Sequence, residues 1–133
     1  MPPHILKSTV RRFYLTGLLM GVHCPMPPSV DNFINDGDEI KIGKLGVTVV
    51  HCPGHSPGHV AFFVATESTK PLLFCGDLIF EGSIGRTDFP GCDPHAMEKS
   101  LMRLKTFPRE TTLFPGHRGL TSVGAELDTN PFL

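Results

Sequence analysis

An apolar, β-branched run covers residues 47–52, stops at Pro53-Gly54 and is followed directly by His55. Such a run predicts a buried strand, and a Pro-Gly pair predicts the turn that ends it. The same pattern occurs twice more: residues 72–76 end in Gly before Asp77, and residues 111–116 end in Gly before His117. Three strands of one sheet that end at the same edge would bring these three side chains together.

Two imidazoles and a carboxylate suit zinc or iron better than calcium or magnesium, which prefer oxygen ligands. Each candidate also has an ordinary interpretation, because a loop histidine can bond to the backbone and Gly-Asp is a common turn. The threefold repetition favours a metal site made of His55, Asp77 and His117. His59 opens the next predicted strand, so we expect it to support the ligands without binding the metal itself.

The composition restricts the class of protein. A length of 133 residues predicts one domain over residues 1–133. The net charge of -1 gives no basic surface for nucleic acid. No apolar run is long enough for a membrane span, and no signal peptide is recognisable, so a cytoplasmic protein without membrane contact is expected. The four cysteines show no C-x-x-C spacing, which argues against a structural zinc knuckle, and Cys92 is the best candidate for a reactive thiol.

Hydrophobic periodicity and turn residues predict an ordered series of elements. A helix is expected over residues 8–20 and a second after the capping residue Asp93, extending to about residue 106. A long loop is expected over residues 81–91. Strands are expected at residues 39–42, 47–52, 59–65, 71–76 and 111–114, the last of these being the final strand. The expected core residues of this sheet are Val47, Val49, Phe62, Val64, Leu73 and Phe74.

Four segments together resemble the metallo-β-lactamase superfamily, and within it the short bacterial glyoxalase II-like hydrolases (hydroxyacylglutathione hydrolases). These segments are residues 52–59, 75–77, 82–90 and 115–117, and the closing residues 130–133 are also similar to that branch. The resemblance covers roughly residues 36–133. It implies an α/β fold: the C-terminal half of an αβ/βα sandwich, with a mixed β-sheet flanked by helices and an apolar face that a second half would cover.

The resemblance also implies roles for individual residues. His55 corresponds to a ligand of the first metal ion, His117 to a ligand of the second, and Asp77 to the catalytic carboxylate that bridges both. Arg86 occupies a position where some relatives hold a carboxylate of the glutathione moiety, through a charge-assisted pair. A solvated loop arginine is the alternative for Arg86. His59 keeps its supporting role.

Two departures from the family pattern bear on function. The signature His-x-His-x-Asp-His is absent from this sequence, so it resembles a truncated family member. Zinc is the expected metal, with iron or manganese as alternatives; the complete family fold holds two ions, and we expect one or none here. Arg118 stands where relatives often carry Gly, and its role is left open.

The implied reaction is metal-assisted hydrolysis of a small-molecule thioester of the S-lactoylglutathione type, through hydroxide generated at the metal centre. Because most of the family's ligands are absent, this chain alone is expected to be weak or inactive. The alternatives are a non-catalytic metal-binding remnant and another activity of the superfamily, such as that of a lactonase or a persulfide dioxygenase. Two partners remain open: a second copy of the chain, in a dimer, and a complementing N-terminal half.

Overall fold

The computed structural model of the protein describes residues 21–22, 30–66 and 69–133. The chain divides into two compact units, residues 1–34 and residues 35–133, and the elements below all belong to the second unit. The helix predicted over residues 8–20 lies outside the described residues. None of the helices in the described part of the chain is long and apolar enough to cross a membrane. The single domain predicted over residues 1–133 stays a prediction.

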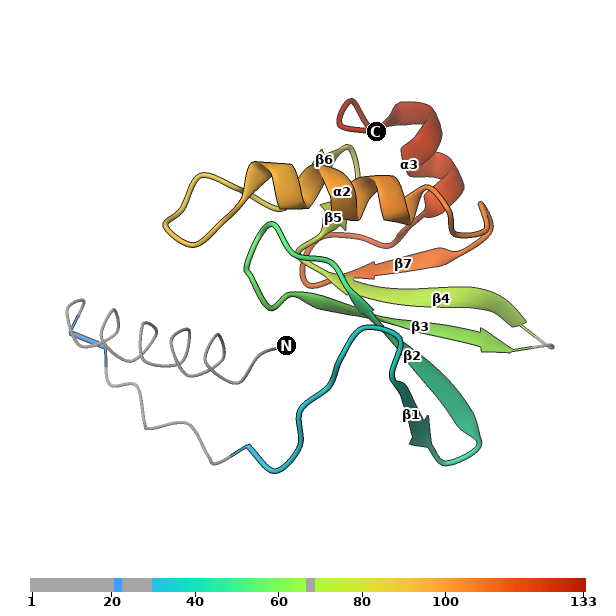
Figure 1. The fold of residues 1–133 in the computed structure, drawn as a ribbon. Helices are drawn as coiled ribbons and strands as arrows, with labels where there is room; N and C mark the ends of the chain where they lie inside the picture. Colours follow the sequence, from blue (N-terminus) through green and yellow to red (C-terminus); the bar gives the residue numbers. More distant parts are fainter. Residues whose placement is uncertain (1–20, 23–29, 67–68) are drawn as a thin grey trace. The chain divides into compact units, whose positions relative to one another are not determined.

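A six-stranded mixed sheet is the framework of residues 35–133 (Figure 1). Its strands follow the order β1-β2-β3-β4-β7-β8. The bounds are β1 Glu39–Ile42, β2 Leu45–His51, β3 Val60–Thr66, β4 Thr69–Gly76, β7 Thr112–Pro115 and β8 Thr121–Ser122. All neighbouring strands are antiparallel except β4 and β7, which are parallel. The predicted α/β fold with a mixed sheet is thereby confirmed.

The crossover between the parallel strands β4 and β7 contains most of the remaining structure. It holds the short hairpin of β5 (Ile79–Phe80) and β6 (Ser83–Ile84), followed by the helix α2 (Pro94–Leu104). The Asp93 side chain caps α2, as predicted, by accepting hydrogen bonds from the backbone N–H groups of His95 and Ala96. A crossover of this length is what a parallel strand pair requires.

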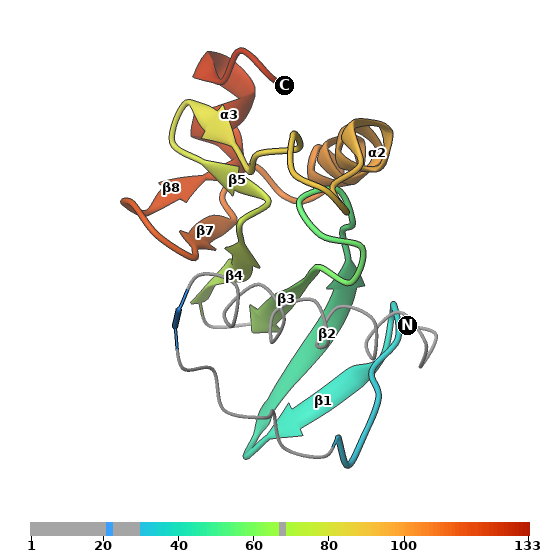
Figure 2. The same cartoon turned by 90° about the vertical axis from the view of Figure 1, so that its left-hand side faces the viewer.

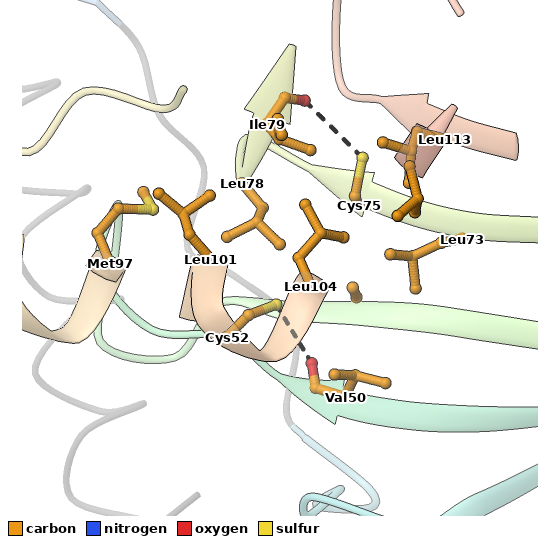
Figure 3. Packing of buried hydrophobic residues seen from close by; sticks show 12 residues of the cluster. Val50, Cys52, Leu73, Cys75, Leu78, Ile79, Met97, Leu101, Leu104 and Leu113 are labelled. Atoms are coloured by element: carbon orange, nitrogen blue, oxygen red, sulfur yellow. Dashed lines mark hydrogen bonds between the residues drawn. The ribbon is translucent and has the colours of Figure 1, made fainter. Parts of the chain in front are cut away.

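The hydrophobic core lies between the sheet and its helices (Figure 3). Figures 1 and 2 show α2 alongside the sheet, and Figure 2 also shows α3 (Val123–Thr129), which follows β8. Helix α2 contributes Met97, Leu101 and Leu104, which are buried on its inner face. The sheet contributes alternate residues of its strands, because successive side chains point to opposite faces. These sheet residues are Val50, Ala61, Leu73, Cys75 and Leu113, and Cys52, directly after β2, adds to them.

The opposite face of the sheet is also apolar, as predicted. Paired residues place Val49, Phe62, Phe74 and Phe114 in one row across β2, β3, β4 and β7. Phe74 stacks on Phe114 with ring centroids 4.9 Å apart and remains 44% exposed. The prediction of Phe74 as a core residue is therefore wrong, because its neighbour Leu73 takes the core face and Phe74 must point the other way.

Three elements were missed by the predictions. The hairpin β5–β6 lies partly inside the loop expected over residues 81–91, and β8 and α3 follow the strand that was predicted to be the last. All of them are short, with two residues in each strand and seven in α3. Strands this short carry no periodicity that a sequence pattern could reveal.

A buried polar network holds the C-terminal elements together. Glu126 is fully buried and accepts hydrogen bonds from Thr121 Oγ1 (2.5 Å), Gly82 N (3.0 Å) and Asn130 Nδ2 (2.7 Å). Asn130 Nδ2 also contacts the backbone carbonyls of Phe80 (3.3 Å) and Ser83 (3.1 Å). Because a buried carboxylate is stable only when its oxygens are satisfied, this network fixes β8 and α3 against the β5–β6 hairpin.

The buried side chain of Thr111 tests the packing where residue 111 contacts the start of α3 through the Val123 N–H. Its side chain is fully buried, and Oγ1 has no hydrogen-bond partner in the described part of the chain. Since valine has the same shape without a hydroxyl to desolvate, Thr111→Val is expected to raise the free energy of unfolding by about 1 kcal/mol in urea denaturation. Thr121→Val should instead lower it by about 1–3 kcal/mol, because Glu126 would lose a donor. A fall in stability on Thr111→Val would contradict this account.

Candidate metal centre

The predicted ligands Asp77 and His117 follow the two parallel strands of the sheet. Asp77 comes directly after β4, and His117 lies two residues after the end of β7. The register pairs Gly76 with Pro115, so the carboxyl ends of the two strands meet at the same edge. His55 reaches this edge from the loop between β2 and β3. The structure therefore brings the three side chains to one edge of the sheet, and their part in binding metal stays a prediction.

The carboxylate of Asp77 is shared between the two imidazoles. His55 Nε2 lies 3.4 Å from Asp77 Oδ2, and His117 Nε2 lies 3.7 Å from Asp77 Oδ1. The three side chains are only partly covered, with exposed fractions of 29%, 33% and 59% for His55, Asp77 and His117. Each carboxylate oxygen thus faces a different histidine across a gap that is open to solvent.

Gly116 is required for this close approach of β4 and β7. A Cβ at residue 116 would lie 2.6 Å from Asp77 Oδ1, which is closer than real Cβ contacts allow. Gly116 N also donates a hydrogen bond to the carbonyl of Gly76 (2.9 Å). The glycine before His117 therefore does more than form a turn, because it leaves room for the carboxylate between the strand ends.

His59 supports Asp77 through its backbone. The Asp77 N–H donates a hydrogen bond to His59 Nε2 (3.1 Å), and His59 Nδ1 lies 3.4 Å from Cys52 Sγ. Since Nε2 accepts from a backbone N–H, it is not available to a metal ion and the ring proton is assigned to Nδ1. Burial, together with the nearby His55, lowers the pKa of His59, which keeps the ring neutral. This geometry is what a supporting role for His59 requires.

Two contacts orient His55, one with its imidazole ring and one with its backbone carbonyl. Its Nδ1 lies 3.1 Å from the carbonyl oxygen of Arg86, which leaves Nε2 facing Asp77. The thiol of Cys92 donates a hydrogen bond to the carbonyl of His55 (3.0 Å). No local sequence pattern indicates this contact, because it joins positions 37 residues apart. A histidine held in one tautomer in this way is typical of metal sites.

The Arg86 side chain is paired within the chain. Its Nε and Nη2 each donate a 2.8 Å hydrogen bond to the carboxylate of Asp88, and its guanidinium carbon lies 3.4 Å from the ring centroid of Phe89. The Arg86 pair lowers the pKa of Asp88 to about 2. A bidentate pair occupies the part of the guanidinium that would bind a substrate carboxylate. Substrate binding by Arg86 stays a prediction, with Asp88 as a direct competitor.

Phe80 and Arg118 complete the surroundings of His117. The Phe80 ring stacks on the imidazole of His117 with centroids 4.3 Å apart and planes 27° apart, and it is 4% exposed. The guanidinium carbon of Arg118 lies 5.4 Å from the centroid of the same ring. Phe80 was not predicted as a site residue, although it directly follows the apolar residues Leu78 and Ile79.

The donor atoms are spaced for metal binding in two pairs, His55 with Asp77 and His117 with Asp77. Ligands that share a zinc ion at about 2.0–2.2 Å lie about 3–3.5 Å apart, close to the separations of Asp77 from His55 and His117. Among the described residues, no three His, Cys, Asp or Glu side chains form a group that could hold one ion. The chemistry of the donors thus suits zinc or iron, but each pair falls short of the three or four ligands that zinc takes.

The fold, and the strand ends that are followed by His55, Asp77 and His117, point to one protein family. Residues 10–117 match the model of the metallo-beta-lactamase superfamily, and the chain belongs to that family.

Solved structures and curated relatives agree with this assignment. TTHA1623, solved in a di-iron-bound form, superposes with a TM-score of 0.78 at 40% identity, covering 97% of this chain and 62% of that one. The hydroxyacylglutathione hydrolase GloC of Haemophilus influenzae is 37% identical over 80% of this chain and 52% of its own length. The probable metallo-hydrolase YqgX of Bacillus subtilis is 36% identical over 89% of this chain and 54% of its own. The chain thus spans about half the length of the curated relatives it matches.

Proposed function

We propose that this chain supplies part of a dinuclear metal centre that hydrolyses thioesters of the S-lactoylglutathione type. Asp77 would lie between the two ions, with His55 on one and His117 on the other. The observation that carries the proposal is the division of the Asp77 carboxylate, whose Oδ2 faces His55 and whose Oδ1 faces His117. Bound ions would supply Lewis-acid activation of water and of the thioester carbonyl. The name of the Haemophilus influenzae relative supports a glutathione thioester as substrate.

The chain's own residues hold this site in a defined geometry. The carbonyl of Arg86 orients His55 through Nδ1, and Phe80 fixes the plane of the His117 imidazole. His59 fixes the backbone of Asp77, so the carboxylate is presented from a rigid strand end. A departing thiolate needs little protonation, because a thiol has a pKa of about 8.5, and no dedicated general acid is required.

We expect this chain alone to have only weak activity, because it supplies too few metal ligands. Three side chains shared by two ions give each ion one histidine and one carboxylate oxygen, whereas catalytic zinc takes three protein ligands. The remaining donors would come from a segment with His-x-His-x-Asp-His, on the same polypeptide or on a partner. Such a partner would also cover the apolar row that includes Phe74 and Phe114.

The test is to supply the missing half and to measure metal content and hydrolysis together. The N-terminal part of GloC that precedes its match to this chain would be added as a fusion or as a separate polypeptide. We expect about two ions per complex and cleavage of S-lactoylglutathione, whereas the chain alone should hold one ion or none. His55→Ala should reduce turnover of the completed protein by more than about 100-fold, because losing a ligand exceeds the 10–100-fold cost of losing its support.

His95→Ala is the matched control, since His95 is exposed at the start of α2 and is not among the candidate ligands. Its turnover should remain within about twofold of the unmodified protein. Full activity of the isolated chain would show that its own donors suffice. A completed protein that binds two ions and leaves thioesters intact would exclude the thioesterase and indicate a different hydrolase of the superfamily.

A further inference from the structure

Arg118 differs from the other arginines in the described part of the chain. Three of the four described arginines are paired with an aspartate of the same chain. The pairs are Arg86–Asp88 (2.8 Å), Arg103–Asp36 (2.7 Å) and Arg109–Asp128 (2.7 Å). Arg118 makes no ion pair or hydrogen bond with any described residue, and it is exposed. Its charge and its five donors are therefore available to a ligand.

The backbone of Arg118 is held in an unfavourable conformation. Its φ of 69° is the only positive value at a residue other than glycine in the described part of the chain. An L-residue with a long side chain rarely adopts this left-handed region, whereas glycine adopts it without strain. Strain that is retained at one residue beside a candidate site indicates that the side chain itself has a use there.

The position of Arg118 places its charge beside the candidate metal centre. It follows His117 directly, and both side chains contact Phe80: the imidazole stacks at 4.3 Å and the guanidinium carbon lies 5.4 Å from the ring centroid. Phe80 itself is buried. The carboxylate of Glu81 lies 4.0 Å from the place a Cβ on Gly119 would take, and it makes no ion pair with Arg118 in the described part of the chain.

We propose that Arg118, and not Arg86, binds a carboxylate of the ligand at this site. The ligand class is then a thioester whose thiol portion is anionic. The inference rests on the proposed function for the identity of the ligand, and on the unpaired, strained Arg118 for its point of attachment. A guanidinium matches a carboxylate through two parallel hydrogen bonds. Arg86 could do the same only by giving up Asp88, which already holds it through two bonds.

The experiment measures binding of a pair of non-hydrolysable probes to the full 133-residue chain by calorimetry. The probes are S-hexylglutathione and its diethyl ester, which differ only in the two carboxylates. We expect the charged probe to bind about 10- to 100-fold more tightly, as for hydrogen bonds between charged groups. Arg118→Gln and Arg118→Gly should both remove this preference, and Arg118→Lys should restore part of it. Glycine adopts this positive φ without strain, so Arg118→Gly is expected to keep the fold intact while it removes the guanidinium.

Two further variants decide where the carboxylate binds. Arg109→Gln is the neutral control, since its partner Asp128 belongs to α3, and the preference should be unchanged. If Arg86→Gln removes the preference and Arg118→Gln keeps it, the proposal is overturned in favour of Arg86. Equal binding of the two probes by the unmodified chain, or no binding of either, also overturns it. Because these measurements need no turnover, a completed protein that prefers the charged probe through Arg118 but leaves thioesters intact would contradict the hydrolase proposal alone.

Discussion

Replacing Gly54 with alanine is expected to unfold most of the protein or to lower its free energy of unfolding by about 3–5 kcal/mol. A Cβ at residue 54 would lie 2.5 Å from the Cα and 2.6 Å from the Cβ of Met97. The backbone of α2 cannot retreat, because Met97, Leu101 and Leu104 are buried in the core. The φ of 144° at Gly54 adds strain for any other residue. This loss approaches the whole stability of a typical domain.

The measurement is urea denaturation followed by far-ultraviolet circular dichroism, with Gly46→Ala as the matched control. Gly46 lies in β2, has an ordinary φ and has no atom within 4 Å of the position its Cβ would take. Its replacement should change the free energy of unfolding by less than about 1 kcal/mol. If both variants unfold at the same urea concentration as the unmodified protein, the close approach of α2 to residue 54 is wrong.

Asp77→Asn is expected to weaken metal binding by the completed protein by more than about 100-fold. The amide keeps the shape of the side chain but loses the charge and one of the two oxygens, which face His55 and His117 separately. Loss of one shared ligand should therefore affect both ions at once, whereas His55→Ala and His117→Ala should each affect mainly one. Competition with a coloured chelator at pH 7 measures the affinity, and elemental analysis gives the number of ions per complex.

Asp88→Asn is the control for Asp77, because it removes a nearby aspartate that pairs with Arg86 on the surface. It should leave both the affinity and the number of ions unchanged. If Asp77→Asn retains two tightly bound ions, Asp77 does not bridge them and the assignment of the site fails. If it loses a single ion, the carboxylate belongs to one ion only, and the site needs a different arrangement of donors.

The sequence by itself determined the three segments that carry the candidate ligands His55, Asp77 and His117. Each consists of an apolar run, a glycine and a metal-competent side chain, and these are local features that a strand and a tight turn reproduce in any surroundings. The parallel pairing of β4 and β7 then follows from the helical crossover between them, and it places Asp77 and His117 at one edge. The helix at residues 94–104 and the capping role of Asp93 were predictable for the same local reasons.

Only the tertiary structure decided which apolar residues are covered and which charges are free. Leu73 and Phe74 are equally apolar in sequence, but α2 and α3 pack on one face of the sheet, so Leu73 is buried and Phe74 is 44% exposed. Helix α3 depends on the contacts of Glu126 with residues up to 44 positions away. Arg86 and Arg118 both look like loop arginines in the sequence. In the folded protein Arg86 pairs with Asp88, whereas Arg118 lies beside Phe80. These outcomes depend on long-range contacts, which local propensity and periodicity do not encode.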